Sequence, residues 1–124
     1  MPNPRVLVVE DEPLIAMLVE AWLEELQCET VGPAASAEAA LALIGGAPLD
    51  GAILDVSLDG HDSFAVAAAL RERAIPFAFA TGHAAERIEE RFRDVPRMAK
   101  PYDFARVKSV LAKLFDSRGS SRAG

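Results

Sequence analysis

Two short apolar runs, each closed by a carboxylate, constrain the fold of this chain more than any other feature. The first is Arg5–Glu10 (Arg-Val-Leu-Val-Val-Glu) and the second is Gly51–Asp55 (Gly-Ala-Ile-Leu-Asp). Continuous apolar runs of this length are typical of strands that are buried on both faces of a sheet. A third strand is predicted at Phe77–Thr81, ending at Gly82. Together the three segments predict a parallel sheet.

The segments around these runs predict helices and two shorter strands. Apolar residues recur at helical spacing over residues 14–26, and Pro13 suits the first helical turn because its missing N–H is not needed there. Ser36, Asp103 and either Asp62 or Ser63 are predicted helix N-caps. We expect strands over 28–31 and 97–100, helices over 37–46, 63–73, 84–92 and 104–115, and a loop over 56–61. Five strands alternating with helices predict a doubly wound α/β domain with helices on both faces.

The size and composition of the chain exclude several classes of protein. The 124 residues suit one domain, and an apolar fraction of 51% excludes a disordered chain. The net charge of −6 disfavours nucleic-acid binding, and no apolar run is long enough for a membrane span or a signal peptide. The lone Cys28 cannot form an internal disulfide, which fits a reducing compartment without proving one, and a cytoplasmic protein is expected by default. We predict one domain over residues 1–117 and a disordered tail over 118–124.

Polar residues with a common chemistry follow the predicted strands. In open α/β sheets, sites lie beyond the C-terminal ends of the strands, where Glu10, Asp11, Asp55, Thr81 and Lys100 fall. Three neighbouring carboxylates repel one another, and a hard cation such as Mg²⁺ relieves that conflict. A carboxylate nucleophile, a metal, a lysine and a hydroxyl are sufficient for phosphoryl transfer to an aspartate.

Each of these features also has a purely structural explanation when it is considered alone. An aspartate after a strand is most often a turn or cap residue, and Glu10-Asp11-Glu12 could complement a helix dipole. Thr81 could belong to a turn, and Lys100 could be a solvated charge before Pro101. The functional interpretation is favoured because four features at four strand ends suit one chemistry.

These residues resemble the receiver domains of two-component response regulators. The resemblance rests on Val-Val-Glu10-Asp11-Glu-Pro, Ile-Leu-Asp55, Ala-Thr81-Gly and Lys100-Pro101, and it covers residues 5 to about 116. It implies a flavodoxin-like strand order 2-1-3-4-5. It also implies that the chain is a phosphoacceptor, not an enzyme acting on a separate substrate.

The resemblance also implies a role for each residue of the site. Asp55 would be the phosphoacceptor, and Glu10, Asp11, Asp55 and the Ser57 carbonyl would bind Mg²⁺, with Glu10 binding directly or through water. The remaining implied features are phosphoryl contacts from Thr81 and Lys100 and a cis peptide bond between Lys100 and Pro101.

Several departures from the usual receiver pattern bear on signalling. Asp59 lies where a proline is usual, and Arg97 occupies the position of an aromatic switch residue. Ser57 and His83 lie two residues after Asp55 and Thr81, where receivers tune the lifetime of the acyl phosphate; a loop histidine without a role is the alternative for His83. The run Pro76–Gly82 is similar to a subgroup of receivers, often single-domain, that work with kinases of the HWE type.

Two rival interpretations remain to be weighed. A phosphatase of the haloacid-dehalogenase type would need Asp-x-Asp-x-Thr after its first strand, and the chain has Glu10-Asp11-Glu12-Pro13 there. A receiver-like interaction module that does not use phosphorylation would usually lack an acid, the acceptor or the lysine, and all are present.

We therefore expect a single-domain response regulator without a DNA-binding output domain, phosphorylated by a sensor histidine kinase. It would act by protein binding, as a phosphate sink, or by relay to a histidine phosphotransfer protein; homodimerisation stays open.

Overall fold

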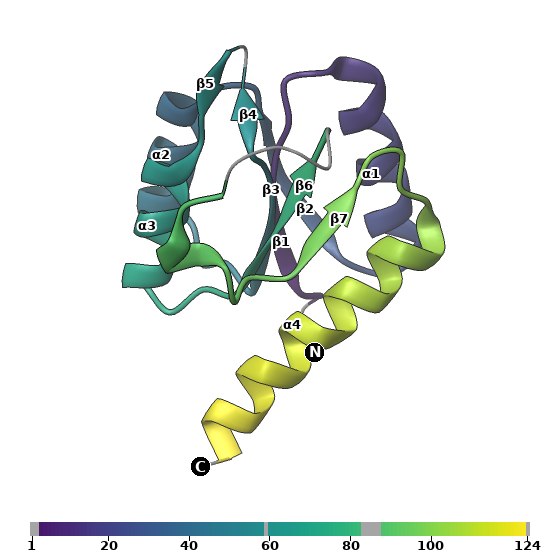
Figure 1. The fold of residues 1–124 in the computed structure, drawn as a ribbon. Coiled ribbons are helices and arrows are strands. Elements are labelled where there is room, and N and C mark those ends of the chain that lie inside the picture. The colour runs from purple at the N-terminus through teal and green to yellow at the C-terminus, as the bar shows by residue number, and fades with distance from the viewer. Residues whose placement is uncertain (1–2, 59, 83–87, 124) are drawn as a thin grey trace.

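A parallel sheet of five strands lies at the centre of the protein (Figure 1). The computed structural model describes residues 3–58, 60–82 and 88–123. The strand order is β2-β1-β3-β6-β7, which confirms the predicted flavodoxin-like order 2-1-3-4-5. The strands are β1 (Arg5–Val9), β2 (Glu29–Ala34), β3 (Gly51–Asp55), β6 (Phe77–Thr81) and β7 (Arg97–Ala99).

Helices cover both faces of this sheet, as predicted. One face is covered by α1 (Pro13–Glu25) and α4 (Phe104–Ala123), and the other by α2 (Ala37–Gly46) and α3 (Phe64–Glu72) (Figure 1). Within each pair the two helices contact each other. In the described part of the chain, no helix combines the length and the apolar character needed to cross a membrane.

The alternation of side chains along β1 explains why its apolar run is uninterrupted. Val6 and Val8 belong to the core under α1 and α4, whereas Leu7 and Val9 belong to the core under α2 and α3. Successive side chains of a strand point to opposite faces, so a strand covered on both sides must be apolar at every position. Two separate hydrophobic cores therefore hold the sheet between its helices.

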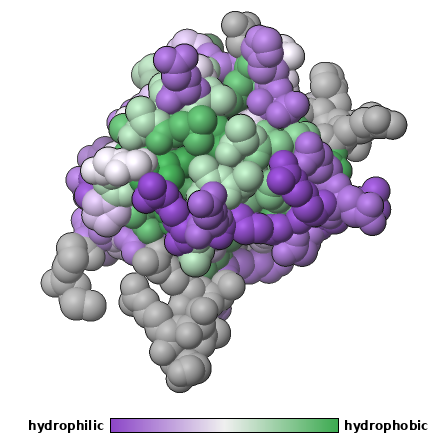
Figure 2. All heavy atoms as spheres, turned by 90° about the vertical axis from the view of Figure 1, so that its left-hand side faces the viewer, coloured by the Kyte–Doolittle hydropathy of each residue, from purple (hydrophilic) through white to green (hydrophobic). Residues whose placement is uncertain are grey.

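The face formed by α2 and α3 carries hydrophobic side chains in its middle and hydrophilic ones around them (Figure 2). Both helices are rich in alanine, the residue with the highest helix propensity. Among the described residues of this face, Leu41 on α2 is the one large hydrophobic side chain that is exposed, at 40%.

The helix starts confirm the predicted local signals. Pro13 occupies the first turn of α1, and the Ser36 hydroxyl accepts a hydrogen bond of 3.1 Å from the Ala39 N–H at the start of α2. Asp103 accepts a hydrogen bond of 2.9 Å from the Arg106 N–H in the first turn of α4. Capping by side-chain oxygens satisfies N–H groups that have no partner within the helix.

Two predicted boundaries in the first half of the chain were wrong. Strand β2 does not end before Gly32 but continues to Ala34, because one extra residue in β2 shifts its register with β1 and the Glu10 N–H donates to the Ala34 carbonyl at 2.9 Å. The predicted loop over 56–61 contains an antiparallel hairpin of β4 (Ser57–Leu58) and β5 (His61–Asp62). Gly60, with φ of +83°, supplies the left-handed conformation that a tight hairpin turn requires.

Two predictions in the second half also need correction. The helix predicted over 84–92 is absent from the described residues 88–92, which form only the 3₁₀ turn η1 (Glu90–Phe92), and residues 84–87 lie outside the described part. Phe92 is the one fully buried side chain of this turn, so a single anchor holds it and no continuous apolar face is formed. Helix α4 does not end near Phe115 and runs to Ala123, since no proline interrupts its polar end. The division into a domain over 1–117 and a tail over 118–124 stays a prediction.

Candidate metal and phosphoryl site

Residues from four strand ends meet at one edge of the sheet. Glu10 directly follows β1, Asp55 ends β3, Thr81 ends β6 and Lys100 follows β7. The parallel pairing of these strands places their C-terminal ends together, which is where α/β sheets bind ligands. The structure thereby brings Glu10, Asp55 and Lys100 into direct contact.

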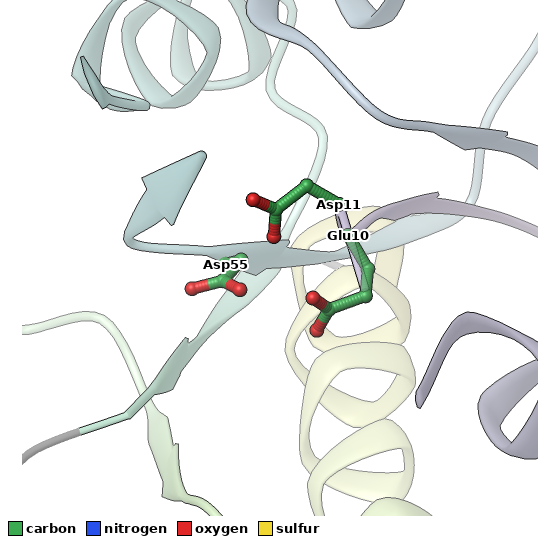
Figure 3. Close-up of side chains that lie close together, drawn as sticks. All are labelled: Glu10, Asp11 and Asp55. Atoms are coloured by element: carbon green, nitrogen blue, oxygen red, sulfur yellow. The ribbon is translucent and has the colours of Figure 1, made fainter. Parts of the chain in front are cut away.

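Three carboxylates converge on a common space at this edge (Figure 3). Glu10, Asp11 and Asp55 each offer an oxygen, and these oxygens lie within 4.8 Å of one another. Glu10 and Asp55 are buried, both with 4% of their surface exposed, and Asp11 is half-buried. Burial weakens the screening of their mutual repulsion. The three groups can therefore all be ionised only if a cation lies among them; otherwise one of them retains a proton.

Lys100 supplies one positive charge to this cluster. Its Nζ donates a hydrogen bond of 2.7 Å to Asp55 Oδ2 and lies 2.9 Å from Glu10 Oε1. Burial alone would lower the pKa of Lys100, but its hydrogen bond to Asp55 and the two facing carboxylates outweigh burial and raise that pKa. The lysine is therefore charged at every physiological pH. The peptide bond between Lys100 and Pro101 is cis.

Glu10 is the carboxylate most affected by its surroundings. Burial and the charge of Asp55 raise the pKa of Glu10 to about 7, despite the lowering effects of Lys100 and of the Glu12 N–H, which donates to Glu10 Oε2 at 3.1 Å. Glu10 Oε1 is buried, and its partner among the described residues is the Lys100 ammonium at 2.9 Å. Three carboxylates that share one ammonium group form an all-oxygen donor set that fits a hard divalent cation such as Mg²⁺.

The orientation of Asp55 is set by the turn that follows it. Asp55 Oδ1 accepts a hydrogen bond of 3.2 Å from the Ser57 N–H, while Oδ2 faces Lys100. The carbonyl of Asp55 accepts a hydrogen bond of 2.5 Å from the Ser63 hydroxyl. The sequence suggested only a capping role for Ser63. The contact with Asp55 could not be predicted because it spans eight residues and depends on the conformation of the intervening hairpin.

The other predicted residues are placed less directly. The Thr81 hydroxyl is buried and donates to the Met98 carbonyl at 3.5 Å, not to a carboxylate. Arg97 is exposed on β7, and its guanidinium donates to the Arg93 carbonyl at 3.5 Å. His83 and Asp59 lie outside the described residues. The predicted roles of Thr81, Arg97 and His83 stay predictions.

A small apolar pocket adjoins the site on its α1 side. It encloses about 100 Å³ and is lined by Ile15, Leu18, Trp22, Lys100, Pro101 and Tyr102. The rings of Trp22 and Tyr102 meet edge to face, with centroids 6.4 Å apart. Because Lys100 belongs to both the pocket and the charged cluster, a molecule that approached Asp55 along α1 would meet this apolar surface.

Comparison with known proteins places the chain in a family. The chain is 44% identical to SdrG from Sphingomonas melonis Fr1. Its superposition on the solution structure of SdrG has a TM-score of 0.82 and covers 92% of this chain and 98% of the SdrG chain. The BeF₃-activated conformation of SdrG from Pseudomonas melonis Fr1 is also 44% identical and covers 93% of this chain and 99% of that one, with a TM-score of 0.78. The phyllosphere-induced regulator PhyR of Methylorubrum extorquens is 33% identical over 123 residues, 95% of this chain and 46% of that protein.

The chain spans less than half the length of the curated relatives it matches, from 28% to 46%. Residues 6–111 match the family described as the response regulator receiver domain. That match covers the core under α2 and α3, nearly all of the core under α1 and α4, and the whole acidic cluster. The chain therefore belongs to the receiver domains of response regulators.

Proposed function

We propose that this receiver accepts a phosphoryl group on Asp55 from a partner histidine kinase, in a reaction that depends on Mg²⁺. The observation that carries the proposal is the cluster in which Asp55 meets Glu10 and Asp11 within 4.8 Å and Lys100 at 2.7 Å. An isolated aspartate at a strand end would not need two further carboxylates and a buried lysine around it. Such an arrangement suits phosphoryl transfer.

The proposed reaction forms one bond and breaks one. An oxygen of the Asp55 carboxylate attacks the phosphorus, and the bond from phosphorus to the donor breaks, leaving an acyl phosphate on Asp55. A bound Mg²⁺, held by Glu10, Asp11, Asp55 and the Ser57 carbonyl, would offset the charge of the phosphoryl oxygens. Lys100 now bonds Asp55, and it would turn to the new phosphoryl group together with the Thr81 hydroxyl.

The proposed partner is a sensor histidine kinase of the HWE type. Support for the kinase type comes from the run Pro76–Gly82. Support for phosphorylation itself comes from the 44% identity to SdrG, for which a BeF₃-activated conformation is known. BeF₃ mimics a phosphoryl group, so activation of that relative is consistent with phosphorylation of this chain. The signal would pass on by phosphorylation-dependent protein binding or by relay to a histidine phosphotransfer protein. We further propose Ser57 and His83 as residues that tune the phosphate lifetime, and Arg97 as the switch position.

Phosphorylation of the purified chain tests this proposal directly. Acetyl phosphate with Mg²⁺ should add the mass of one phosphoryl group to the wild type, and Asp55→Asn should stay unmodified. The same increment in Asp55→Asn would assign the phosphoryl group to another residue. An unmodified wild type with both Mg²⁺ and acetyl phosphate present would favour the alternative, a receiver-like interaction module that does not use phosphorylation.

A further inference from the structure

Ser63 is a buried hydroxyl that does not do what its position suggests. It precedes α3 as the N-cap residue and has none of its surface exposed, yet its side chain makes no capping hydrogen bond. The first amide of the helix is served by Asp62 instead, whose Oδ1 accepts from the Phe64 N–H at 3.2 Å. The Ser63 hydroxyl is therefore available for another contact.

That contact is with the backbone of the proposed phosphoacceptor. Ser63 Oγ lies 2.5 Å from the Asp55 carbonyl and 3.2 Å from the Val56 carbonyl. The Val56 carbonyl already accepts from the Ser63 N–H at 3.0 Å. A hydroxyl has one proton to donate, so the shorter contact identifies the Asp55 carbonyl as its acceptor. A buried carbonyl oxygen needs such a donor.

The peptide unit held by the Ser63 hydroxyl, between Asp55 and Val56, adjoins the peptide unit whose N–H orients the Asp55 side chain. Rotation of this unit would move the neighbouring Ser57 N–H, which donates to Asp55 Oδ1 at 3.2 Å. It would also displace Ser57 as a whole, including the carbonyl that we propose as a metal ligand. On its other side, the Val56 N–H is tied to the Ala80 carbonyl of β6 at 3.0 Å. The hydroxyl thus closes the open side of a turn that is anchored to the sheet on its other side.

We propose that Ser63 is a positioning residue for phosphorylation, which acts by fixing the turn at residues 55–57. This inference rests on the proposed function of Asp55. Ser63 touches neither the phosphoryl group nor the metal in this scheme, and it acts through the orientation of Asp55 and Ser57. Groups that orient metal ligands in this way typically change metal affinity by about 10–100-fold when they are lost.

Two serine variants separate positioning from a general loss of stability. Ser63→Ala removes the hydroxyl that donates to the Asp55 carbonyl, and Ser36→Ala removes the hydroxyl that accepts a hydrogen bond from the Ala39 N–H at the start of α2. Both should lower the melting temperature. Only Ser63→Ala should weaken Mg²⁺ binding, by about tenfold in an NMR titration of the ¹⁵N-labelled chain without any phosphodonor. Its labelling by acetyl phosphate at subsaturating Mg²⁺ should slow by a similar factor.

The inference and the proposed function fail in different ways. If the wild type is labelled at Asp55 while folded Ser63→Ala keeps wild-type Mg²⁺ affinity and rate, Ser63 has only a structural role and the inference is overturned. If the wild type itself takes no label, the proposed function fails first. Should Ser63→Ala not fold, Ser63→Cys provides a weaker donor at the same position. Weakened Mg²⁺ binding by folded Ser63→Cys supports the inference, and wild-type affinity overturns it.

Discussion

At the scale of single residues, the site is defined by an imbalance of charge. Lys100 contacts both Asp55 and Glu10, but one ammonium group cannot neutralise three carboxylates that converge within 4.8 Å. Burial makes the imbalance costly, and Glu10 responds by retaining a proton up to a pKa of about 7. Near neutral pH the cluster can therefore bind either a proton at Glu10 or a metal ion.

This competition predicts a pH-dependent effect of Mg²⁺ on stability. The pKa of Glu10 is raised from 4.5 to about 7 in the folded protein, so the folded state binds more protons than the unfolded state between these values. Without metal, the contribution of Glu10 to stability is complete below about pH 4.5 and is lost as the pH rises through about 7. Mg²⁺ should therefore raise the melting temperature more at pH 8 than at pH 5.5, because at the lower pH it must displace a proton.

Thermal melts with and without millimolar Mg²⁺ at the two pH values measure this difference. Glu10→Gln is the control, since it keeps the shape of the side chain and cannot titrate. In that variant the Mg²⁺ effect should be weaker and should lose most of its pH dependence. Equal Mg²⁺-induced shifts at pH 5.5 and pH 8 in the wild type would contradict the role assigned to Glu10.

At the scale of elements, the sequence predicted what depends on pattern and missed what depends on tertiary contacts. The strands β1, β3 and β6 were predictable because burial on both faces requires apolar residues at every position. The meeting of Glu10 and Asp55 followed from the shared edge of parallel strands. The extension of β2 was missed because Gly32-Pro33, taken as the end of the strand, instead lies where β2 has one more residue than β1 between two paired positions.

The same distinction applies to the candidate site. Which residues gather there could be predicted from strand ends, but their burial and pairing could not. The pKa of Glu10 depends on how fully the site is covered, and the contact of Ser63 with Asp55 depends on the hairpin of β4 and β5. Neither property follows from residue spacing alone.

The segment before β7, which contains the 3₁₀ turn η1 and no regular helix, is predicted to be anchored by one aromatic side chain. Phe92 in η1 is 1% exposed and packs its ring against those of Phe64, Phe77 and Phe79, with centroids 5.8–6.3 Å away. Phe92→Ala should lower the free energy of unfolding by roughly 3–5 kcal/mol, the usual range for a buried phenylalanine. Asp94→Asn removes the exposed ion pair with Arg71 and should have a much smaller effect, because water screens that pair.

Urea denaturation of the two variants compares the apolar and ionic contributions, and amide exchange reports on residues 88–95. Exchange in this segment should accelerate in folded Phe92→Ala and change little in Asp94→Asn. A larger loss of stability in Asp94→Asn than in Phe92→Ala would show that the ion pair, and not the aromatic cluster, anchors the segment.

At the scale of the whole molecule, exposed apolar surface is distributed unevenly. Among the described residues, the large hydrophobic side chains that are exposed are Leu14, Met17 and Leu18 on α1, at 76%, 64% and 52%, and Leu41 on α2 at 40%. Leu18 also lines the pocket that contains Lys100. A donor of the phosphoryl group that we propose for Asp55 would have to approach from outside the sheet edge, so the α1 surface lies beside its path. Exposed apolar groups beside a reactive centre are typical of a protein-docking surface.

This arrangement predicts that α1 serves the protein donor and is dispensable for a small one. Met17→Glu places a charge in the apolar surface without touching the carboxylates or Lys100, so it should slow transfer from a purified HWE-type kinase that phosphorylates the wild type, by about tenfold or more. Labelling by acetyl phosphate should be unchanged, since that molecule needs no docking surface.

Leu41→Glu is the matched control on the opposite face and should leave both reactions at the wild-type rate. Equal slowing of both donors by Met17→Glu would mean that the variant disturbs the site itself, and an unchanged kinase reaction would move the docking surface away from α1.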